Sequence, residues 1–336
     1  MKSRALTTIG AAAAALALAL TGCASDAGDA GGATGDKLSA VMYSSNNETV
    51  IGVVTDAAAA HDPAVKVEAV TGSSGPLLER IASESGAPAA DVFYSAPAAT
   101  FEAFADYVEP YLSPEAAAIP EELIDPDHRW TAANAHVVAF MVNTNQIDGG
   151  KAPKSWAELT KPEWKGKVIA PNPEQSTTGF TALYGAYKVL GKEDFEKLVA
   201  NLELTESTSN VYPAVAQGEY AVSIGYESNI YPYIAGEQAG IEMVYPEDGT
   251  FVEHDSVLLV KGGPNADGGK ALIDVILSKK AQEENLAQSF RRPVRTDIDV
   301  ASIVDFKALD DLNVVDIHGD DDTQGRADFT EYWKSL

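Results

Sequence analysis

The sequence predicts an α/β fold, because short apolar strands alternate with helices along most of the chain. Residues 38–43 and 65–70 have the apolar and alternating patterns of strands. A helix is expected over 48–60, capped by Asn46 or Asn47, and another over 75–85. Strands that are separated by helices usually pair in parallel. We therefore expect a parallel sheet with helices packed on it.

The remaining elements continue this alternation. Further strands are expected over 91–94, 136–143, 168–170, 220–226, 241–245 and 256–260. Further helices are expected over 98–107, 178–190, 194–202, 210–217, 264–277 and 279–289. Residues 151–167, which are rich in Trp, Pro and Lys, are expected at the surface. The acidic tail over 300–336 ends in Phe329, Tyr332 and Trp333, so we expect its end to pack against the domain.

The N-terminus has the pattern of an export signal. Lys2 and Arg4 precede an apolar run over 9–20, which is shorter than the roughly 20 residues that a membrane-spanning helix needs. The run ends in Leu20-Thr21-Gly22-Cys23, which resembles a bacterial lipobox. The resemblance implies a signal peptide over 1–22 and a lipid-modified Cys23, followed by a Gly- and Ala-rich tether over 23–37. Acyl chains on Cys23 would anchor the protein on the outer face of the cell membrane or in the periplasm. The alternative is an ordinary signal peptide followed by a cysteine without a role.

Composition limits the possible partners. Cys23 is the only cysteine in 336 residues, so the chain forms no internal disulfide. The net charge is −26, and cleavage before Cys23 would remove Lys2 and Arg4 and make it −28. Such a surface does not attract nucleic acid or anionic lipid. We expect a monomer of two domains without a cofactor.

Several segments together resemble the solute-binding proteins of ATP-driven (ABC) importers. They are Val41–Asn47, Gly72–Leu78, Asp91–Tyr94, Ala152–Trp156 with Trp164–Lys167, Gly218–Glu227 and Arg292–Arg295. The resemblance is to the ferric-iron, 2-aminoethylphosphonate and sugar-phosphate branch of the type II periplasmic-binding fold. It implies two lobes with a ligand cleft between them, joined by crossings near 140–143 and 250–255. Lobe 1 would comprise 38–141 plus 253–336, with the tail placed on it, and lobe 2 would comprise 142–252.

Three polar loops are the main candidates for ligand binding, because each lies between a predicted strand and a predicted helix. Ligands of open α/β sheets bind at the carboxyl ends of strands, where helix N-terminal N–H groups favour anions. Hydroxyl groups add hydrogen-bond donors, and glycine allows the backbone to approach a ligand closely. The alternative is that these residues only cap helices. The loops are Ser44-Ser45-Asn46, Ser73-Ser74-Gly75 and Ser176-Thr177-Thr178-Gly179.

Tyr94, Ser95, Tyr226 and Glu227 complete the candidate set, because they follow two further predicted strands. Iron-binding relatives carry adjacent tyrosines at the position of Tyr226, and here the second is replaced by Glu227. If the ligand is iron, Tyr226 and Glu227 are the expected metal ligands; otherwise no metal is expected. Glu227 is interpreted as a partner for ligand hydroxyls or amines, or as a solvent-facing acid at a helix N-terminus.

Each of four basic residues has two interpretations, one as a ligand-binding residue and one as a surface residue. His254 is a cleft donor or a surface histidine near the second crossing. Arg291, Arg292 and Arg295 steer an anion or, more simply, pair with the nearby Asp297 and Asp299.

The sequence lacks the motifs of the common enzyme classes. It contains no G-x-S-x-G, no H-E-x-x-H and no phosphate-binding loop. The leading hypothesis is a lipid-anchored receptor that captures a phosphonate or organophosphate and delivers it to a membrane permease. A ferric-iron receptor is the alternative within the same class, and a sensor that presents its ligand to a membrane receptor is a further one. A secreted phosphatase-like lipoprotein is the disfavoured alternative from another class.

Overall fold

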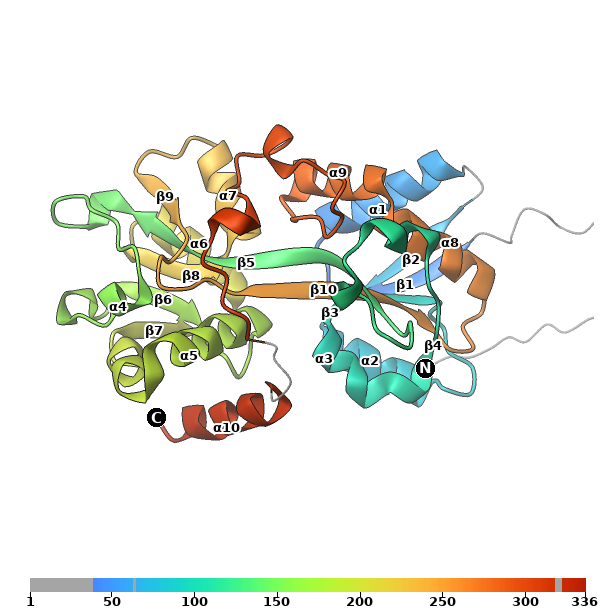
Figure 1. Ribbon diagram of the computed structural model, residues 1–336, viewed down its shortest axis with the longest axis horizontal. Helices are drawn as coiled ribbons and strands as arrows, with labels where there is room; N and C mark the ends of the chain where they lie inside the picture. The colour runs from blue at the N-terminus through green and yellow to red at the C-terminus, as the bar shows by residue number, and fades with distance from the viewer. Residues whose placement is uncertain (1–38, 63–64, 318–321) are drawn as a thin grey trace, which may run out of the picture. The chain divides into compact units, whose positions relative to one another are not determined.

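The computed structural model describes residues 39–62, 65–317 and 322–336, without the side chains of 322 and 323 (Figure 1). The predicted signal peptide, the lipobox and the whole tether over 23–37 therefore lie outside the described residues. Within the described part, no helix combines the length and the apolar character that crossing a bilayer requires.

One mixed sheet runs through the described part, in the order β2-β1-β3-β10-β5-β8-β6-β7. In its first half, β1 (Ala40–Ser44) pairs in parallel with β2 (Val67–Thr71) and β3 (Val92–Pro97). In its second half, β6 (Val168–Pro171) pairs in parallel with β7 (Leu202–Thr205) and β8 (Val222–Tyr226). The prediction of parallel strands between helices is therefore confirmed for both halves.

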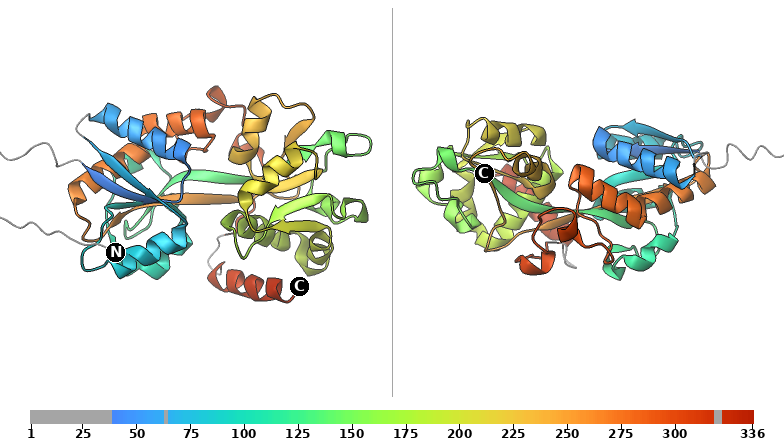
Figure 2. Two further views of the ribbon diagram at one scale, coloured as in Figure 1. Left: turned by 180° about the vertical axis from the view of Figure 1, so that it is seen from behind. Right: turned by 90° about the horizontal axis from the view of Figure 1, so that it is seen from above.

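Two long antiparallel strands join the halves, as Figures 1 and 2 show. Strand β5 (Thr131–Asn143) pairs with β10 (Val252–Val260) as far as Val137 and with β8 from Val138 onward. The first change of partners therefore comes slightly before the predicted 140–143. Strand β10 pairs with β3 from Asp255 onward, within the predicted second crossing. Two short strands, β4 (Val108–Glu109) and β9 (Ile241–Val244), pair with β10 and β5.

Most helices agree with the predicted ranges. The α-helices are α1 (Glu48–His61), α2 (Ser74–Ser83), α3 (Ala98–Phe101), α4 (Trp156–Leu159), α5 (Thr177–Val199), α6 (Thr208–Ala216), α7 (Glu227–Ala235), α8 (Ala266–Leu277), α9 (Lys279–Ser289) and α10 (Asp322–Lys334). The 3₁₀ helices are η1 (Glu102–Tyr107), η2 (Pro114–Ala118), η3 (Glu121–Leu123), η4 (Thr144–Gln146), η5 (Pro162–Trp164), η6 (Val300–Ser302) and η7 (Leu309–Asp311). Gly191, with a φ of 69°, breaks α5 between the two predicted helices.

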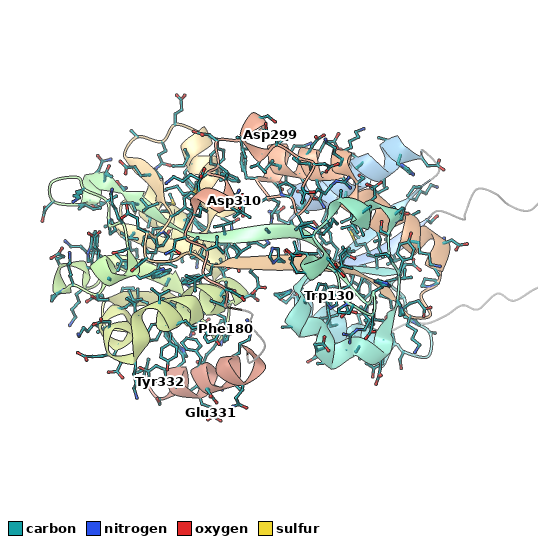
Figure 3. All side chains as sticks on the ribbon, viewed as in Figure 1. Trp130, Phe180, Asp299, Asp310, Glu331 and Tyr332 are labelled. Carbon is teal, nitrogen blue, oxygen red and sulfur yellow. The ribbon has the colours of Figure 1, made fainter. Side chains whose placement is uncertain are left out.

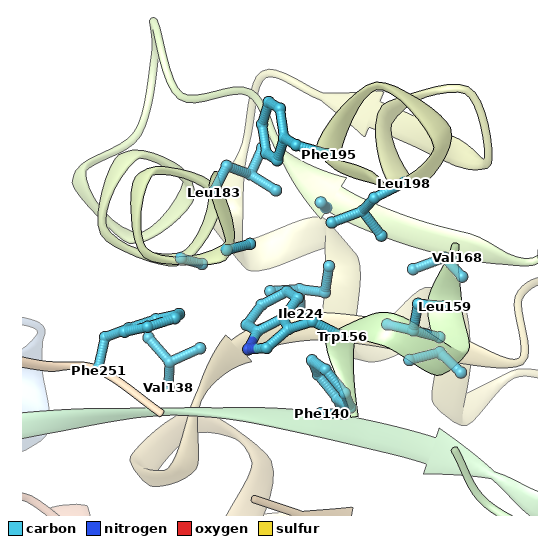
Figure 4. Packing of buried hydrophobic residues seen from close by; sticks show 14 of the residues in the cluster. Val138, Phe140, Trp156, Leu159, Val168, Leu183, Phe195, Leu198, Ile224 and Phe251 are labelled. Atoms are coloured by element: carbon cyan, nitrogen blue, oxygen red, sulfur yellow. The ribbon is translucent and has the colours of Figure 1, made fainter. Parts of the chain in front are cut away.

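Residues 151–167 are not a purely surface segment, so that prediction is wrong for both tryptophans. Trp156 is fully buried and Trp164 is 6% exposed. Trp156 packs against Phe140 and Phe251 in the core of the second half (Figure 4). Its indole Nε1 donates a hydrogen bond to the carbonyl of Gly249 at 2.8 Å. An indole with this partner is well suited to a core position.

The C-terminal tail packs down as predicted, but on the second half of the sheet rather than on lobe 1. Phe329 and Trp333 of α10 belong to the same buried cluster as Tyr184 and Phe195 of α5. Phe180 and Tyr332, labelled in Figure 3, extend this aromatic contact. Burial of these rings explains the placement, because each removes a large apolar area from water. The prediction that the tail joins lobe 1 is therefore wrong for α10.

Candidate ligand-binding site

Three serines meet near the carboxyl ends of β1, β2 and β3: Ser45 follows β1, Ser74 begins α2 after β2, and Ser95 lies near the end of β3. The Ser45 hydroxyl donates a hydrogen bond to the carbonyl of Ser95 at 2.6 Å. The Ser74 hydroxyl lies 3.0 Å from the Ser45 oxygen and 3.1 Å from the same carbonyl. We call Ser45, Ser74 and Ser95 the serine cluster. Its members stand beside the N-termini of α1 and α2, where the sequence analysis placed two of the ligand loops.

Ser95 connects this cluster to the two long strands. Its φ of 89° is unusual for a residue with a side chain, and such conformations persist where the surroundings fix them. The Ser95 hydroxyl donates to Asp255 Oδ2 of β10 at 2.8 Å. The same carboxylate oxygen lies 2.9 Å from His136 Nε2 of β5. Ser95 is therefore held through its carbonyl, which accepts from Ser45 and Ser74, and through its hydroxyl, which donates to Asp255.

His136, Asp255 and Arg291 form a buried polar group at the meeting of β5 and β10. Burial and repulsion from Arg291 lower the pKa of His136, so the imidazole is neutral and its Nε2–H donates to Asp255. Burial opposes ionisation of Asp255, but the hydrogen bonds from His136 and Ser95 and the positive charge of Arg291 lower its pKa below the usual value. The Arg291 guanidinium lies 2.9 Å from His136 Nδ1 and 3.8 Å from Asp255 Oδ2. Asp255 is therefore a carboxylate at neutral pH.

Asn46 is a buried amide without a hydrogen-bond partner. Asn46 is only 4% exposed, and neither its Oδ1 nor its Nδ2 makes a hydrogen bond to another protein group. Its backbone N–H donates to Ser44 Oγ at 3.1 Å, and the Ser44 hydroxyl donates to the Tyr94 carbonyl at 2.8 Å. An unbonded buried polar group costs about 1–3 kcal/mol, so a ligand that supplied a partner for this amide would gain binding energy there.

The helix N-termini differ in whether a side chain caps them. Asn47 caps α1 by accepting from Val50 N, and Ser176 caps α5 by accepting from Gly179 N at 3.1 Å. Ser73, the residue before α2, makes no side-chain cap bond. The capping interpretation is therefore correct for Ser176, whereas the N-terminus of α2 keeps its N–H groups available.

The two glycines of the predicted loops have different roles. A Cβ at Gly179 would lie 2.3 Å from the Pro171 carbonyl, so close packing of α5 on β6 requires glycine there. A Cβ at Gly75 would meet no atom within 4 Å. The open space at Gly75 leaves the N-terminus of α2 accessible. In α5, Thr178 is buried and Thr177 is exposed.

Tyr94 and Tyr226 are both buried phenols. Tyr94 accepts a hydrogen bond from Asn134 Nδ2 at 3.1 Å, and burial together with Asp255 raises its pKa to about 12. The Tyr226 ring stacks on His136 with centroids 4.7 Å apart. Burial, followed by repulsion from Glu253, raises the pKa of Tyr226 well above its usual value. Both side chains are neutral at pH 7.

Glu227 is a buried partner of Arg292, so the interpretation of it as a solvent-facing acid is wrong. Arg292 Nε and Nη2 each lie 2.8 Å from a carboxylate oxygen of Glu227, and Tyr245 donates a further hydrogen bond. The two side chains are only 3% and 1% exposed. Glu227 is thus occupied by protein groups rather than available to a ligand.

The three arginines over 291–295 differ in whether they pair with the nearby aspartates as predicted. Arg295 does pair with Asp297, at 2.9 Å, and also with Glu115. Arg291 instead contacts His136 and Asp255, and Arg292 contacts Glu227, so the predicted pairing with Asp297 or Asp299 is wrong for both. His254 is half-buried on β10.

The structure unites some of the predicted residues and adds others. The loops of the first half meet one another, while in the described residues no hydrogen bond joins them to the loop over 176–179. Asn134, His136 and Asp255 are members of the site that the sequence patterns did not predict. Their signal was polar side chains within buried strands: Asn134 and His136 alternate with alanine in β5, and Asp255 lies in the polar run over 253–256 of β10.

Comparison with known proteins agrees with the fold. Residues 87–314 match the model of the bacterial extracellular solute-binding protein family, and the chain belongs to this family. The putative 2-aminoethylphosphonate-binding periplasmic protein of Salmonella paratyphi A is 28% identical over 247 residues, which cover 70% of this chain and 71% of that one. The Fe(3+)-binding periplasmic protein of Serratia marcescens is 27% identical over 259 residues, with coverages of 72% and 75%.

A solved structure extends this likeness to nearly the whole described part. AfuA, a periplasmic binding protein of Actinobacillus pleuropneumoniae with fructose-6-phosphate bound, is 25% identical with a TM-score of 0.74. The match covers 88% of this chain and 96% of AfuA. The predicted two-lobed α/β periplasmic-binding fold and the predicted branch are confirmed. The protein is an extracytoplasmic solute-binding protein, and its relatives are binding proteins rather than enzymes.

Proposed function

We propose that this protein is the receptor of an ABC importer and that it binds a small organic phosphonate or phosphate. Asn46 is the observation that carries the proposal. Its amide is buried and unbonded beside the N-terminus of α1, which has the favourable end of the helix dipole. An anionic oxygen of the ligand would supply the missing partner for Nδ2. The uncapped N-terminus of α2 would add backbone donors from the neighbouring loop.

Relatives support this class of ligand. One relative is named for 2-aminoethylphosphonate, and AfuA was solved with fructose-6-phosphate. Both ligands carry a tetrahedral oxyanion on a small organic group. Neutral donors at helix ends suit such an anion without a compensating arginine. Closure of the two lobes over the ligand would complete the site and hand the solute to the permease.

A substitution at Asn46 tests this assignment directly. Loss of one hydrogen bond to a charged group corresponds to roughly 1.5–3 kcal/mol, so Asn46→Leu should weaken binding about ten- to hundredfold. Because Leu removes an unbonded buried amide, the unfolding midpoint should stay unchanged or rise. Titration calorimetry of the full chain with 2-aminoethylphosphonate and fructose 6-phosphate measures the affinity.

The neighbouring Asn47 provides the matched control. Its side chain caps α1, so Asn47→Ala should lower stability by about 1 kcal/mol and leave affinity nearly unchanged. Wild-type affinity in Asn46→Leu for both ligands would contradict the proposed anion site.

We also propose that Cys23 carries a lipid anchor at the end of the tether. The Leu20-Thr21-Gly22-Cys23 pattern supports this proposal, because it follows a leader that begins with basic residues and continues with an apolar run. Cys23→Ser should release the protein from the membrane fraction or leave the leader uncleaved. A variant that is still processed and retained like the wild type would refute the anchor.

A further inference from the structure

The serine cluster has its hydroxyl protons directed inward, and this fixes the chemistry that it offers to a ligand. Asp255 is ionised and can only accept, so the Ser95 hydroxyl is the donor in their 2.8 Å bond. The Ser95 carbonyl can also only accept, so the Ser45 hydroxyl donates to it at 2.6 Å. Each of these hydroxyls has a single proton, and that proton is already used.

Ser74 completes the same pattern. Both of its neighbours in the cluster are acceptors, the Ser95 carbonyl at 3.1 Å and the Ser45 oxygen at 3.0 Å. Its proton therefore also points into the cluster. Ser45 is exposed and Ser74 is partly exposed, so their oxygens can be reached from outside. What these oxygens offer to a ligand is lone pairs.

We propose that the serine cluster is an acceptor subsite that selects ligands bearing a hydrogen-bond donor, a hydroxyl or an ammonium group, at a short distance from their phosphorus group. This inference rests on the proposed function, because the anionic group is assigned to Asn46 and the N-terminus of α2. It replaces the expectation that Ser45 and Ser74 donate to the anion. Ser45 precedes Asn46 and Ser74 precedes Gly75, so the acceptor and donor groups come from the same two loops.

Charge near the cluster favours a donor over a second anion. The Asp255 carboxylate is negatively charged and accepts the hydrogen bond of Ser95, a member of the cluster. The group that opposes it, Arg291, contacts His136 and lies 3.8 Å from the Asp255 oxygen. A ligand with a carboxylate at this position would face lone pairs, and each serine would have to give up an internal hydrogen bond to accommodate it.

Four ligands that share one phosphonate group separate the possibilities. They are 2-aminoethylphosphonate, 2-hydroxyethylphosphonate, ethylphosphonate and phosphonoacetate, titrated against the full chain. We expect the amino and hydroxy compounds to bind at least about fivefold more tightly than ethylphosphonate, which corresponds to one hydrogen bond. Phosphonoacetate should bind most weakly. The ratio of amino to hydroxy affinity distinguishes an ammonium from a hydroxyl as the preferred donor.

Variants locate the effect in the cluster. Ser45→Ala should lower affinity for the amino and hydroxy compounds about three- to tenfold and leave ethylphosphonate nearly unchanged. Ser95→Gly, which accepts a positive φ and removes the bond to Asp255, should also reduce the discrimination. Ser83→Ala is the control, because Ser83 donates to a carbonyl of its own helix, outside the cluster.

Three outcomes are decisive. Equal loss for all phosphonates in Ser45→Ala would mean that Ser45 donates to the anion, and it would overturn the acceptor subsite while leaving the proposed function standing. Tightest binding of phosphonoacetate would overturn it as well. Failure of all four phosphonates and of fructose 6-phosphate to bind the wild type would instead refute the proposed function.

Discussion

Replacement of Glu227 by Gln should destabilise the protein without altering which ligand it prefers. In the structure, Arg292 makes two hydrogen bonds of 2.8 Å to the Glu227 carboxylate. The side chains are 3% and 1% exposed, so water cannot replace the lost charge. Leaving one member of a buried ion pair uncompensated costs about 3–5 kcal/mol. We expect a loss of this size in the free energy of unfolding.

The double variant Glu227→Gln/Arg292→Met distinguishes charge from packing. Removing both charges should recover most of the loss, since apolar residues of similar volume often replace buried ion pairs at little cost. Urea unfolding followed by tryptophan fluorescence measures stability, because Trp156 and Trp164 are both buried. Titration of the same proteins with 2-aminoethylphosphonate and fructose 6-phosphate measures ligand preference. Wild-type stability with an altered ligand preference in Glu227→Gln would refute the structural role and return Glu227 to the ligand site.

Three further changes test other parts of the structure. Gly75→Ala should raise stability by about 0.4–1 kcal/mol, because its Cβ meets no neighbour, yet weaken phosphonate binding at the N-terminus of α2; unchanged affinity would place the ligand elsewhere. Phe329→Ala should lower the free energy of unfolding by about 3–5 kcal/mol, because the ring is buried against α5. A loss of less than about 1 kcal/mol would show that α10 does not pack there. Ferric citrate should give no visible tyrosinate band, because burial keeps Tyr226 protonated and Arg292 occupies Glu227; a band that Tyr226→Phe abolishes would establish the iron-binding alternative.

Local patterns predicted the elements that contain the polar loops. Apolar runs followed by Ser, Asn and Gly marked the ends of β1 and β2, and the helices α1 and α2 began close to the expected positions. The loops could therefore be assigned to the carboxyl ends of strands. The directions of their hydroxyl protons could not, because these depend on Ser95 and Asp255, which lie far away in the sequence.

Long-range pairs account for what the sequence analysis missed. Polar residues such as Asn134, Glu253 and Asp255 interrupt the apolar pattern of β5 and β10, so both strands were expected to start several residues too late. These interruptions are part of the site. Glu227 and Arg292 are 65 residues apart, and Arg292 has acidic residues nearer in the chain, Asp297 and Asp299. Trp156 and α10 were misplaced for the same reason, since the surfaces that bury them belong to other segments.

Titration of the full wild-type chain with organic phosphonates and phosphates in iron-free buffer is the most direct test of the proposed function. Saturable heat with 2-aminoethylphosphonate or fructose 6-phosphate, at a stoichiometry near one and weakened in Asn46→Leu, is the predicted result. Binding of ferric citrate alone, with no heat from any phosphonate or phosphate, would contradict it.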